Sequence, residues 1–174
     1  MKEKAFYLQI FDLEFDEGHE YPVAFPILFS LKGASQIYSS ANQVLYICGS
    51  TFSSVEDSDF SSSALYSIDI SKEPLKVSIE VTSCYYHYHP SLAMYKKEIL
   101  VVVGGLDSRK CEYYSISNKK WKNLPELPED RYGCSLYCDD TASTLYLFGG
   151  YDRRNKRRRS SDSFEAFKKN SFNY

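Results

Sequence analysis

The clearest pattern in the sequence is an unbroken apolar run, Ile99 to Val103, followed directly by the glycine pair Gly104-Gly105. The run is too short to span a membrane, and its β-branched residues favour a strand over a helix. Because its apolar residues do not alternate with polar ones, we expect both faces of this strand to be covered. The two glycines allow a positive φ and a tight exit from the strand.

The same pattern returns further along the chain, where the apolar strand 144–148 ends in Gly149-Gly150. The two glycine pairs lie about 45 residues apart, and similarity at such a period indicates stacked supersecondary units. Between the two copies lie a mixed strand, a polar turn and a short strand that two prolines end. Each unit therefore holds four short antiparallel strands.

The apolar strand and its glycine pair are followed by Tyr114, by Trp121 and by Arg131, which opens the next unit. This order resembles the kelch repeat, most closely over 87–150. In that family each repeat forms one four-stranded blade of a β-propeller, and the Trp packs between blades. The resemblance implies an all-β fold, a partial kelch-type β-propeller. The residues that would carry the structural motif are Gly49, Gly104, Gly105, Tyr114, Trp121, Gly149 and Gly150.

Extended to the whole of 1–150, the repeat predicts about three blade-equivalents of four-stranded antiparallel sheets. The expected boundaries are a half-blade at 1–31, blades at 33–82 and 87–128, and a half-blade at 131–150. In the first half-blade the expected strands are 5–14 and 25–31. A closed propeller has about four to eight blades, so we expect a fragment, an open arc or part of an oligomer. The terminal half-blades would then expose apolar faces and allow self-association.

The last 24 residues, 151–174, differ sharply in charge from the rest of the chain. They hold eight Lys or Arg and three Asp or Glu, a net charge of +5 in a chain whose total is -2. Phe164, Phe167 and Phe172 are the only large apolar residues after Tyr151 until the final tyrosine. We therefore expect a disordered basic C-terminal tail that takes no part in a blade.

The basic run 153–159 has two interpretations. It is either a nuclear-import signal or nucleic-acid patch, or a solvated disordered tail without a binding role. Ser160 and Ser161 follow three arginines and resemble a site for a basophilic kinase. Phosphorylation of either serine would reduce the local positive charge.

The sequence offers no constellation that predicts catalysis or a bound metal. His87 and His89 have a spacing that metals can use, but no third ligand converges, so a structural pair of histidines is preferred. The five cysteines form no CxxC pair and predict buried thiols in a reducing compartment, with Cys134 and Cys138 on one strand face in the core. Asp139-Asp140 is interpreted as a turn. We expect no enzyme, no cofactor and no metal.

A partner would bind through loops. In a four-stranded antiparallel blade, the loop between the second and third strands and the link to the next blade emerge on the same face. Here these loops are 50–63 and 105–110, and the links are 83–88 and 125–132. Loops on a rigid scaffold usually carry binding function, and Tyr and Arg are favoured in contacts. The candidate partner-binding residues are Asp57, Asp59, Tyr85, His87, Asp107, Arg109, Arg131 and Tyr132. Arg131 also has a structural interpretation, as the basic residue that opens a repeat.

The predicted function is a non-catalytic protein–protein interaction module of the kelch type with a protein partner. Two alternatives follow from the resemblance: a fragment of a copper-oxidase-like propeller enzyme, and the substrate-recognition part of a ubiquitin-ligase adaptor that lacks its BTB or F-box segment. The N-terminus leads into no long apolar region, so we expect no signal peptide and no membrane span. Nucleic acid is not an expected partner. The expected location is the cytoplasm, with the nucleus as the alternative.

Overall fold

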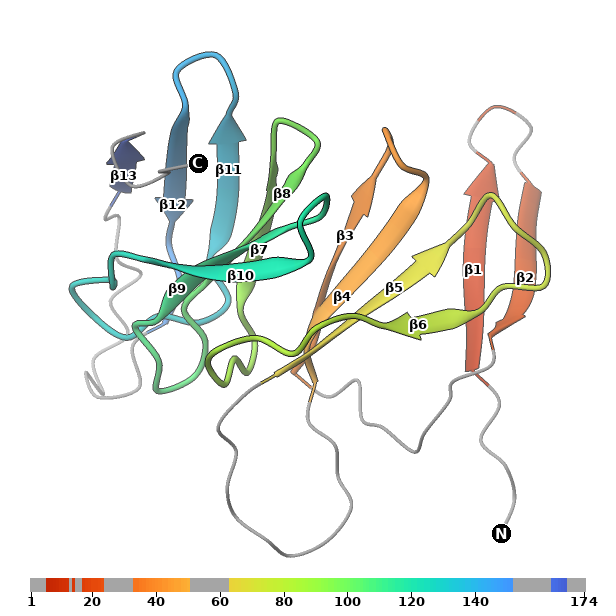
Figure 1. Ribbon diagram of the computed structural model, residues 1–174, viewed down its shortest axis with the longest axis horizontal. Coiled ribbons are helices and arrows are strands. Elements are labelled where there is room, and N and C mark those ends of the chain that lie inside the picture. Colours follow the sequence, from red (N-terminus) through yellow and green to blue (C-terminus); the bar gives the residue numbers. More distant parts are fainter. Residues whose placement is uncertain are drawn as a thin grey trace, which may run out of the picture.

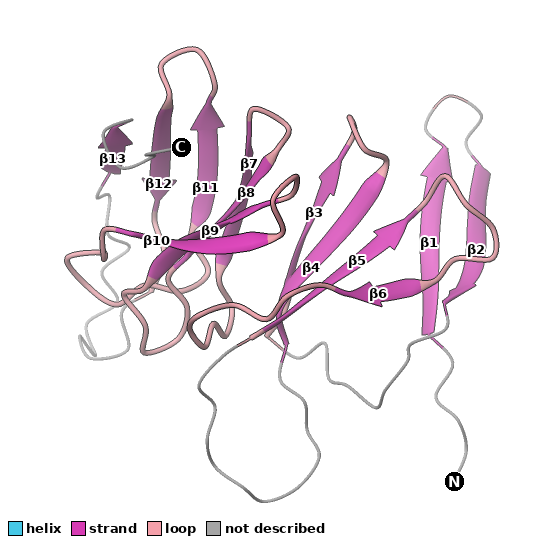
Figure 2. Cartoon of the chain, in the orientation of Figure 1, coloured by secondary structure: helices cyan, strands magenta, loops and turns pink. Residues whose placement is uncertain are grey.

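The computed structural model describes residues 6–12, 14, 17–23, 33–50, 63–151 and 164–168. Within these ranges the fold is all-β, as predicted, and every regular element is a strand (Figures 1 and 2). All strand pairs are antiparallel. In the part of the chain described, no helix is long and apolar enough to cross a membrane.

The strands form four separate sheets, and neighbours in each sheet follow one another in sequence. The N-terminal sheet consists of β1 (Phe6–Asp12) and β2 (Glu17–Val23). The first four-stranded sheet consists of β3 (Ser35–Ser39), β4 (Val44–Ser50), β5 (Ala64–Asp69) and β6 (Val77–Ile79). The second consists of β7 (Ser91–Tyr95), β8 (Ile99–Val103), β9 (Cys111–Ser115) and β10 (Lys120–Leu124). The C-terminal sheet consists of β11 (Ser135–Asp139), β12 (Thr144–Phe148) and β13 (Phe164–Lys168).

The sheets pack face to face, and a hydrophobic core fills each of the three spaces between them. Strand β8 contributes to two of these cores. Val101 and Val103 pack toward the C-terminal sheet with Leu145 and Leu147, while Leu100 on the opposite face packs toward the first four-stranded sheet. All five residues of β8 are buried. The expectation that both faces of this apolar strand are covered is therefore confirmed.

The first strands of successive sheets lie next to one another: β7 contacts both β3 and β11 (Figure 1). Side-chain hydroxyls link these strands to the chain that enters the following sheet. Ser35 Oγ donates to Pro90 O at 2.6 Å, and Ser91 Oγ donates to Cys134 O at 2.8 Å. No sheet closes on itself among the described residues.

The ends of the chain differ from the prediction. Strand β1 pairs with β2, at 17–23, a strand that was not predicted, and the strand expected at 25–31 lies outside the described residues. The prediction that 151–174 takes no part in a sheet fails at β13, which pairs antiparallel with β12. Strand β12 offers an edge of unpaired backbone groups, and a strand added there satisfies them. Ser160, Ser161 and the basic run lie outside the described residues.

Trp121 lies between the two four-stranded sheets, as expected, and its ring is half-buried there. Its Nε1 donates to Val81 O at 2.7 Å, so the polar end of the indole faces the chain beyond β6. The ring packs at 5.2 Å between centroids against Tyr114, which is buried. The Tyr114 hydroxyl donates to Glu80 Oε2 at 3.0 Å, and desolvation by burial followed by this carboxylate raises the pKa of Tyr114.

The cysteines follow the prediction only in part. Cys134 and Cys138 pack against the core between the second four-stranded sheet and the C-terminal sheet, and Cys48 and Cys111 are buried. Cys84 is exposed, contrary to the expectation of buried thiols. Burial raises the pKa of the Cys48 thiol to about 12.

Several hairpin turns hold a residue other than glycine in the left-handed conformation shortly before the next strand begins. These residues are Gln43 (φ 54°), Lys96 (φ 49°), Lys97 (φ 62°), Lys119 (φ 53°) and Ser143 (φ 51°). L-residues with a Cβ adopt this conformation at a cost. In the turn between β11 and β12, Asp139 Oδ1 accepts hydrogen bonds from the Thr141 and Ala142 amides, both at 2.9 Å. The prediction of a turn at Asp139-Asp140 is confirmed.

The glycine pairs that end β8 and β12 have positive φ at all four positions, as expected. Gly104 and Gly149 have nearly the same angle, 65° and 64°, but different surroundings. A Cβ on Gly104 would lie 2.4 Å from the carbonyl oxygen of Arg131, whereas no described atom lies within 4 Å of a Cβ on Gly149. The two sites therefore separate the effect of backbone conformation from that of close approach.

We expect Gly104→Ala to destabilise the protein more than Gly149→Ala does. Gly149→Ala should reduce the free energy of unfolding by about 1 kcal/mol, the typical cost of a Cβ in this conformation. Gly104→Ala adds the displacement of the Arg131 carbonyl, which accepts the Gly105 amide at 2.8 Å, and should cost at least about 1 kcal/mol more. Urea unfolding of both variants measures the difference, and equal losses would contradict the close-approach argument.

Candidate functional site

Three loop segments meet at one end of the second four-stranded sheet, on the side where the β8–β9 loop and the links between sheets emerge (Figure 1). This surface, called the loop face below, consists of 83–90, 104–110 and 125–132. Backbone hydrogen bonds join the segments: the Leu106 amide donates to Tyr88 O at 2.6 Å and the Gly105 amide to Arg131 O at 2.8 Å. The two kinds of loop that the topology was expected to bring together are adjacent.

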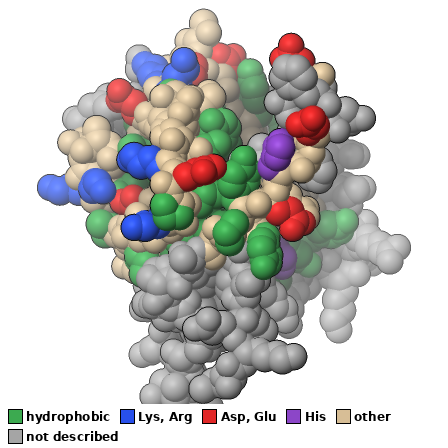
Figure 3. Space-filling model, turned by 90° about the vertical axis from the view of Figure 1, so that its right-hand side faces the viewer, with side chains coloured by type: hydrophobic (Ala, Val, Ile, Leu, Met, Phe, Trp, Pro, Cys, Tyr) green, Lys and Arg blue, Asp and Glu red, His purple; other side chains and the backbone are tan. Residues whose placement is uncertain are grey.

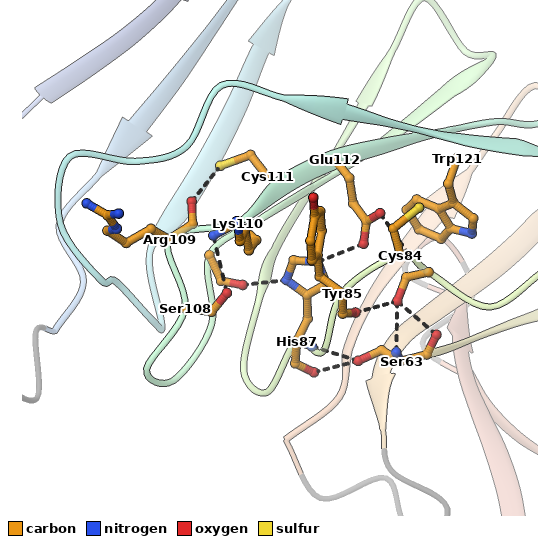
Figure 4. Close-up of polar contacts among 12 residues, drawn as sticks. Ser63, Cys84, Tyr85, His87, Ser108, Arg109, Lys110, Cys111, Glu112 and Trp121 are labelled. Carbon is orange, nitrogen blue, oxygen red and sulfur yellow. Dashed lines mark hydrogen bonds and ion pairs between the residues drawn. The ribbon is translucent and has the colours of Figure 1, made fainter. Parts of the chain in front are cut away.

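The imidazole of His87 lies fully buried beneath the loop face (Figure 4). Its Nδ1 is 2.6 Å from Gly104 O, and its Nε2 is 2.9 Å from Glu112 Oε1. A carbonyl oxygen only accepts, so Nδ1 carries a proton. Nε2 and the Glu112 carboxyl then share a further proton, as an imidazolium–carboxylate pair or as an imidazole that accepts from a carboxylic acid. In either form the pair holds the link between sheets against β9.

Glu112 is fully buried at the second position of β9. Its Oε2 accepts the backbone amide of Cys84 at 3.0 Å, so one carboxyl group binds the chain on both sides of Tyr85 and Tyr86. Desolvation, and then the neighbouring Glu112 carboxyl group, raise the pKa of the Cys84 thiol. A raised pKa disfavours the thiolate, so Cys84 lacks the activation that a nucleophilic cysteine needs.

A pair of buried serines fixes the same segment to the first four-stranded sheet. Ser63, directly before β5, receives the His87 amide on its Oγ at 2.7 Å, and its own amide donates to Ser83 Oγ at 2.8 Å. The Ser83 amide in turn donates to Ser63 O at 2.9 Å, and Ser83 Oγ to Tyr85 O at 2.6 Å. Hydrogen bonds therefore hold the link 83–87 to both four-stranded sheets, and they fix the backbone positions from which its exposed side chains project.

Charged and aromatic side chains form the accessible part of the loop face, and Figure 4 shows three of them, Tyr85, Arg109 and Lys110. Arg109 Nη2 lies 3.0 Å from Glu126 Oε2, and the Lys110 ammonium contacts the other oxygen of the same carboxylate. The hydrogen bond from Lys110 lowers the pKa of Glu126, and the same bond raises the pKa of Lys110. The Lys110 ammonium also lies 4.9 Å from the centre of the Tyr85 ring, within cation–π range.

The structure separates the eight predicted partner-binding residues into four pairs. Asp107 and Arg109 are exposed, and Tyr85 and Tyr132 are half-buried. His87 and Arg131 are buried at 0% and 5% exposure, so the prediction that the loops present these two side chains to a partner is wrong. Asp57 and Asp59 lie outside the described residues. His87 and His89 do not lie on one side of a strand: His87 points inward, and His89 is exposed in a left-handed turn.

Sequence reasoning missed Glu112, Ser63 and Ser83. A single acidic residue at the start of an otherwise apolar and aromatic strand, Cys111 to Ser115, was the available signal for Glu112. A buried carboxyl group requires hydrogen-bond partners, and a histidine within an aromatic segment is a natural one. The serines carry no comparable signal, because serine is common in ordinary loops.

A separate groove of about 360 Å³ lies away from the loop face, near the turns at the opposite end of the second four-stranded sheet. It is lined by Glu98, Ile99, Tyr113, Ser115, Ser117, Asn118, Lys120 and Lys122. Among the described residues, no three His, Cys, Asp or Glu side chains lie close enough to hold a metal ion.

Comparison with known proteins adds the fold alone. No protein-family model and no curated protein matches the sequence. The chain is similar in structure to YjhT, with a TM-score of 0.52 and 16% sequence identity over 74% of this chain. The similar region makes up 36% of the YjhT chain, so the present chain spans little more than a third of that protein. At this identity the likeness concerns the fold and carries no function.

We expect Glu112→Ala to be the most destabilising substitution beneath the loop face. It leaves His87 Nε2 and the Cys84 amide without their buried hydrogen-bond partner, which typically costs about 3–5 kcal/mol. Glu112→Gln should cost much less, because the amide oxygen can accept from Cys84 and the amide nitrogen can donate to His87 Nε2. Urea unfolding measures both changes.

Glu126→Ala is the matched control, because it removes a second ion-paired glutamate from an exposed position. Exposed ion pairs contribute little to stability, so its unfolding curve should stay close to that of the unmodified protein. If Glu112→Ala shifted the unfolding curve no further than Glu126→Ala does, the buried pair would not hold the loop face in place.

Proposed function

We propose that the chain is a partial kelch-type β-propeller that acts as a non-catalytic protein–protein interaction module. The array of face-to-face sheets supports the propeller part of this proposal. Each four-stranded sheet is a meander, and the first strands β3, β7 and β11 are neighbours in sequence order. Propeller blades have this arrangement, with the first strand of each blade nearest the central axis. The apolar strand, glycine pair, Tyr114 and Trp121 support the kelch assignment.

The single observation that carries the binding function is the construction of the loop face. A buried network around His87 and Glu112 holds the first two loops, and backbone hydrogen bonds from Gly105 to Arg131 and from Leu127 to Arg109 hold the third. The outer side chains of these loops are tyrosine, arginine, lysine and acidic residues. Loops of fixed geometry lose little entropy when a partner binds, which favours affinity. Tyrosine and arginine are the residue types that most often dominate contact energies. We propose a protein partner that binds across 83–90, 104–110 and 125–132.

The test compares two double variants of the immobilised full chain. Asp107→Ala/Arg109→Ala changes the loop face, and Lys97→Ala/Lys120→Ala changes exposed residues near the opposite end. Asp107 (φ 57°) and Lys97 (φ 62°) share the left-handed conformation, so the backbone effect of alanine is matched. Proteins captured from a cell extract are quantified by mass spectrometry, and each identified partner is then titrated against all three proteins by calorimetry.

We expect the loop-face variant to weaken binding about tenfold or more, the typical effect of losing a contact hot spot. The control variant should bind like the unmodified protein. Equal affinity for all three proteins would contradict a loop-face partner. Stoichiometric copper in the purified protein would instead favour the oxidase-like alternative.

A further inference from the structure

The groove of about 360 Å³ runs from the core of the molecule to an exposed edge of the second four-stranded sheet. Directly paired residues of antiparallel strands share one face of the sheet, so the register aligns two rows across β8, β9 and β10. The rows are Ile99, Ser115 and Lys120, and Val101, Tyr113 and Lys122. Ile99 and Tyr113 are buried in the core shared with the C-terminal sheet, whereas both lysines are exposed on the edge strand β10. This groove, called the basic groove below, therefore has an apolar floor and a charged rim.

The turn between β9 and β10 adds uncharged hydrogen-bond donors to the basic groove. The side-chain amide of Asn118 donates to Ser115 Oγ at 3.1 Å, and the hydroxyl oxygens of Ser115 and Ser117 lie 3.4 Å apart. The contact between the two hydroxyls uses one of their hydrogens and leaves the other, and the Asn118 amide has a second N–H. These donors line the same groove as the two lysines.

The charges of the basic groove favour an anion. Two lysines against one glutamate, Glu98, give its lining a net positive charge. Among the described residues none of the ion pairs includes Lys120, whereas the adjacent Lys119 pairs with Glu80 at 3.2 Å. Figure 3 shows the Lys and Arg side chains in view gathered on the left, the side that faces the reader in Figure 1 and carries β10.

We propose that the basic groove binds a small phosphate monoester, whose apolar part lies on the floor formed by Ile99 and Tyr113. A phosphate monoester carries a charge of about −1.5 to −2 at pH 7 and has three strong acceptor oxygens. Those oxygens match the two ammonium groups together with the hydroxyl and amide donors, whereas a carboxylate brings one charge and two oxygens. The volume of the groove falls within the range of about 300–1,000 Å³ that is typical of small-molecule sites.

A second role of the two lysines needs less than the groove provides. Lysines on an edge strand hinder its pairing with another chain, and β10 is the edge strand of its sheet. That role requires charge alone. The buried floor and the hydroxyl and amide donors beside the lysines are what favour a bound ligand. Because the basic groove lies at the opposite end of the sheet from the loop face, this binding function is separate from the proposed protein partner.

Calorimetric titration of the full chain with phenyl phosphate at low ionic strength tests the proposal. We expect saturable binding of one molecule per chain, and about tenfold weaker binding of inorganic phosphate, which lacks a group to lie on the floor. Lys120→Met/Lys122→Met should weaken the binding of phenyl phosphate about tenfold or more, because it removes both charges and keeps the length of the side chains. Both lysines are exposed, so the fold should be retained, and urea unfolding checks this.

Lys96→Met/Lys97→Met is the matched control. It removes two exposed lysines from the turn between β7 and β8, outside the lining of the groove. Because exposed charges at a distance are screened, this variant should bind phenyl phosphate within about twofold of the unmodified protein. Glu98→Gln should instead strengthen binding about threefold, because it removes the carboxylate that repels the phosphate.

The proposal is overturned if phenyl phosphate shows no saturable binding, or if inorganic phosphate binds as tightly. Equal weakening by the Lys96/Lys97 and Lys120/Lys122 variants would also overturn it, because it would indicate attraction to the net charge of the molecule and not to a site. Weaker binding by Glu98→Gln has the same consequence. A short peptide with one phosphotyrosine separates a free ester from a phosphorylated protein: if it bound more tightly than phenyl phosphate, the assignment to a small molecule would be wrong.

Discussion

The whole array depends on strands that are buried on two sides at once. Val101 and Val103 belong to the core shared with the C-terminal sheet, and Leu100 and Val102 belong to the core shared with the first four-stranded sheet. A strand in this position cannot leave one core without opening the other. The second four-stranded sheet is therefore the central element, and the positions of its loops are as rigid as the two cores that it joins. A binding surface on those loops is therefore positioned by a rigid sheet.

The elements that the sequence predicted well are those with a strong local reason. The run from Ile99 to Val103 is apolar at every position, and only a strand covered on both faces accommodates it. The glycine pairs mark sites where a side chain either strains the backbone or meets another chain segment, as Gly104 does at Arg131.

The elements that the sequence analysis missed are held in place by partners that lie far away in the sequence. Strand β2, Glu17 to Val23, contains a proline, a glycine and charged residues, and nothing in that composition predicts a strand. Strand β13 follows a strongly basic stretch, and it forms because β12 offers an edge with which to pair. His87 was read as a surface residue because a loop usually exposes its histidines, whereas the partner that holds it inside, Glu112, lies 25 residues away in sequence. Local patterns do not contain such pairings.

The left-handed turn residues have a consequence for how the chain folds. Gln43, Lys119 and Ser143 each adopt this conformation at the end of a hairpin turn, although none is the glycine or asparagine that would favour it. These turn sequences favour a hairpin less than glycine or asparagine would, so we expect the apolar strands on either side to supply much of the energy that closes each turn. Hairpin closure should then follow strand pairing rather than nucleate it.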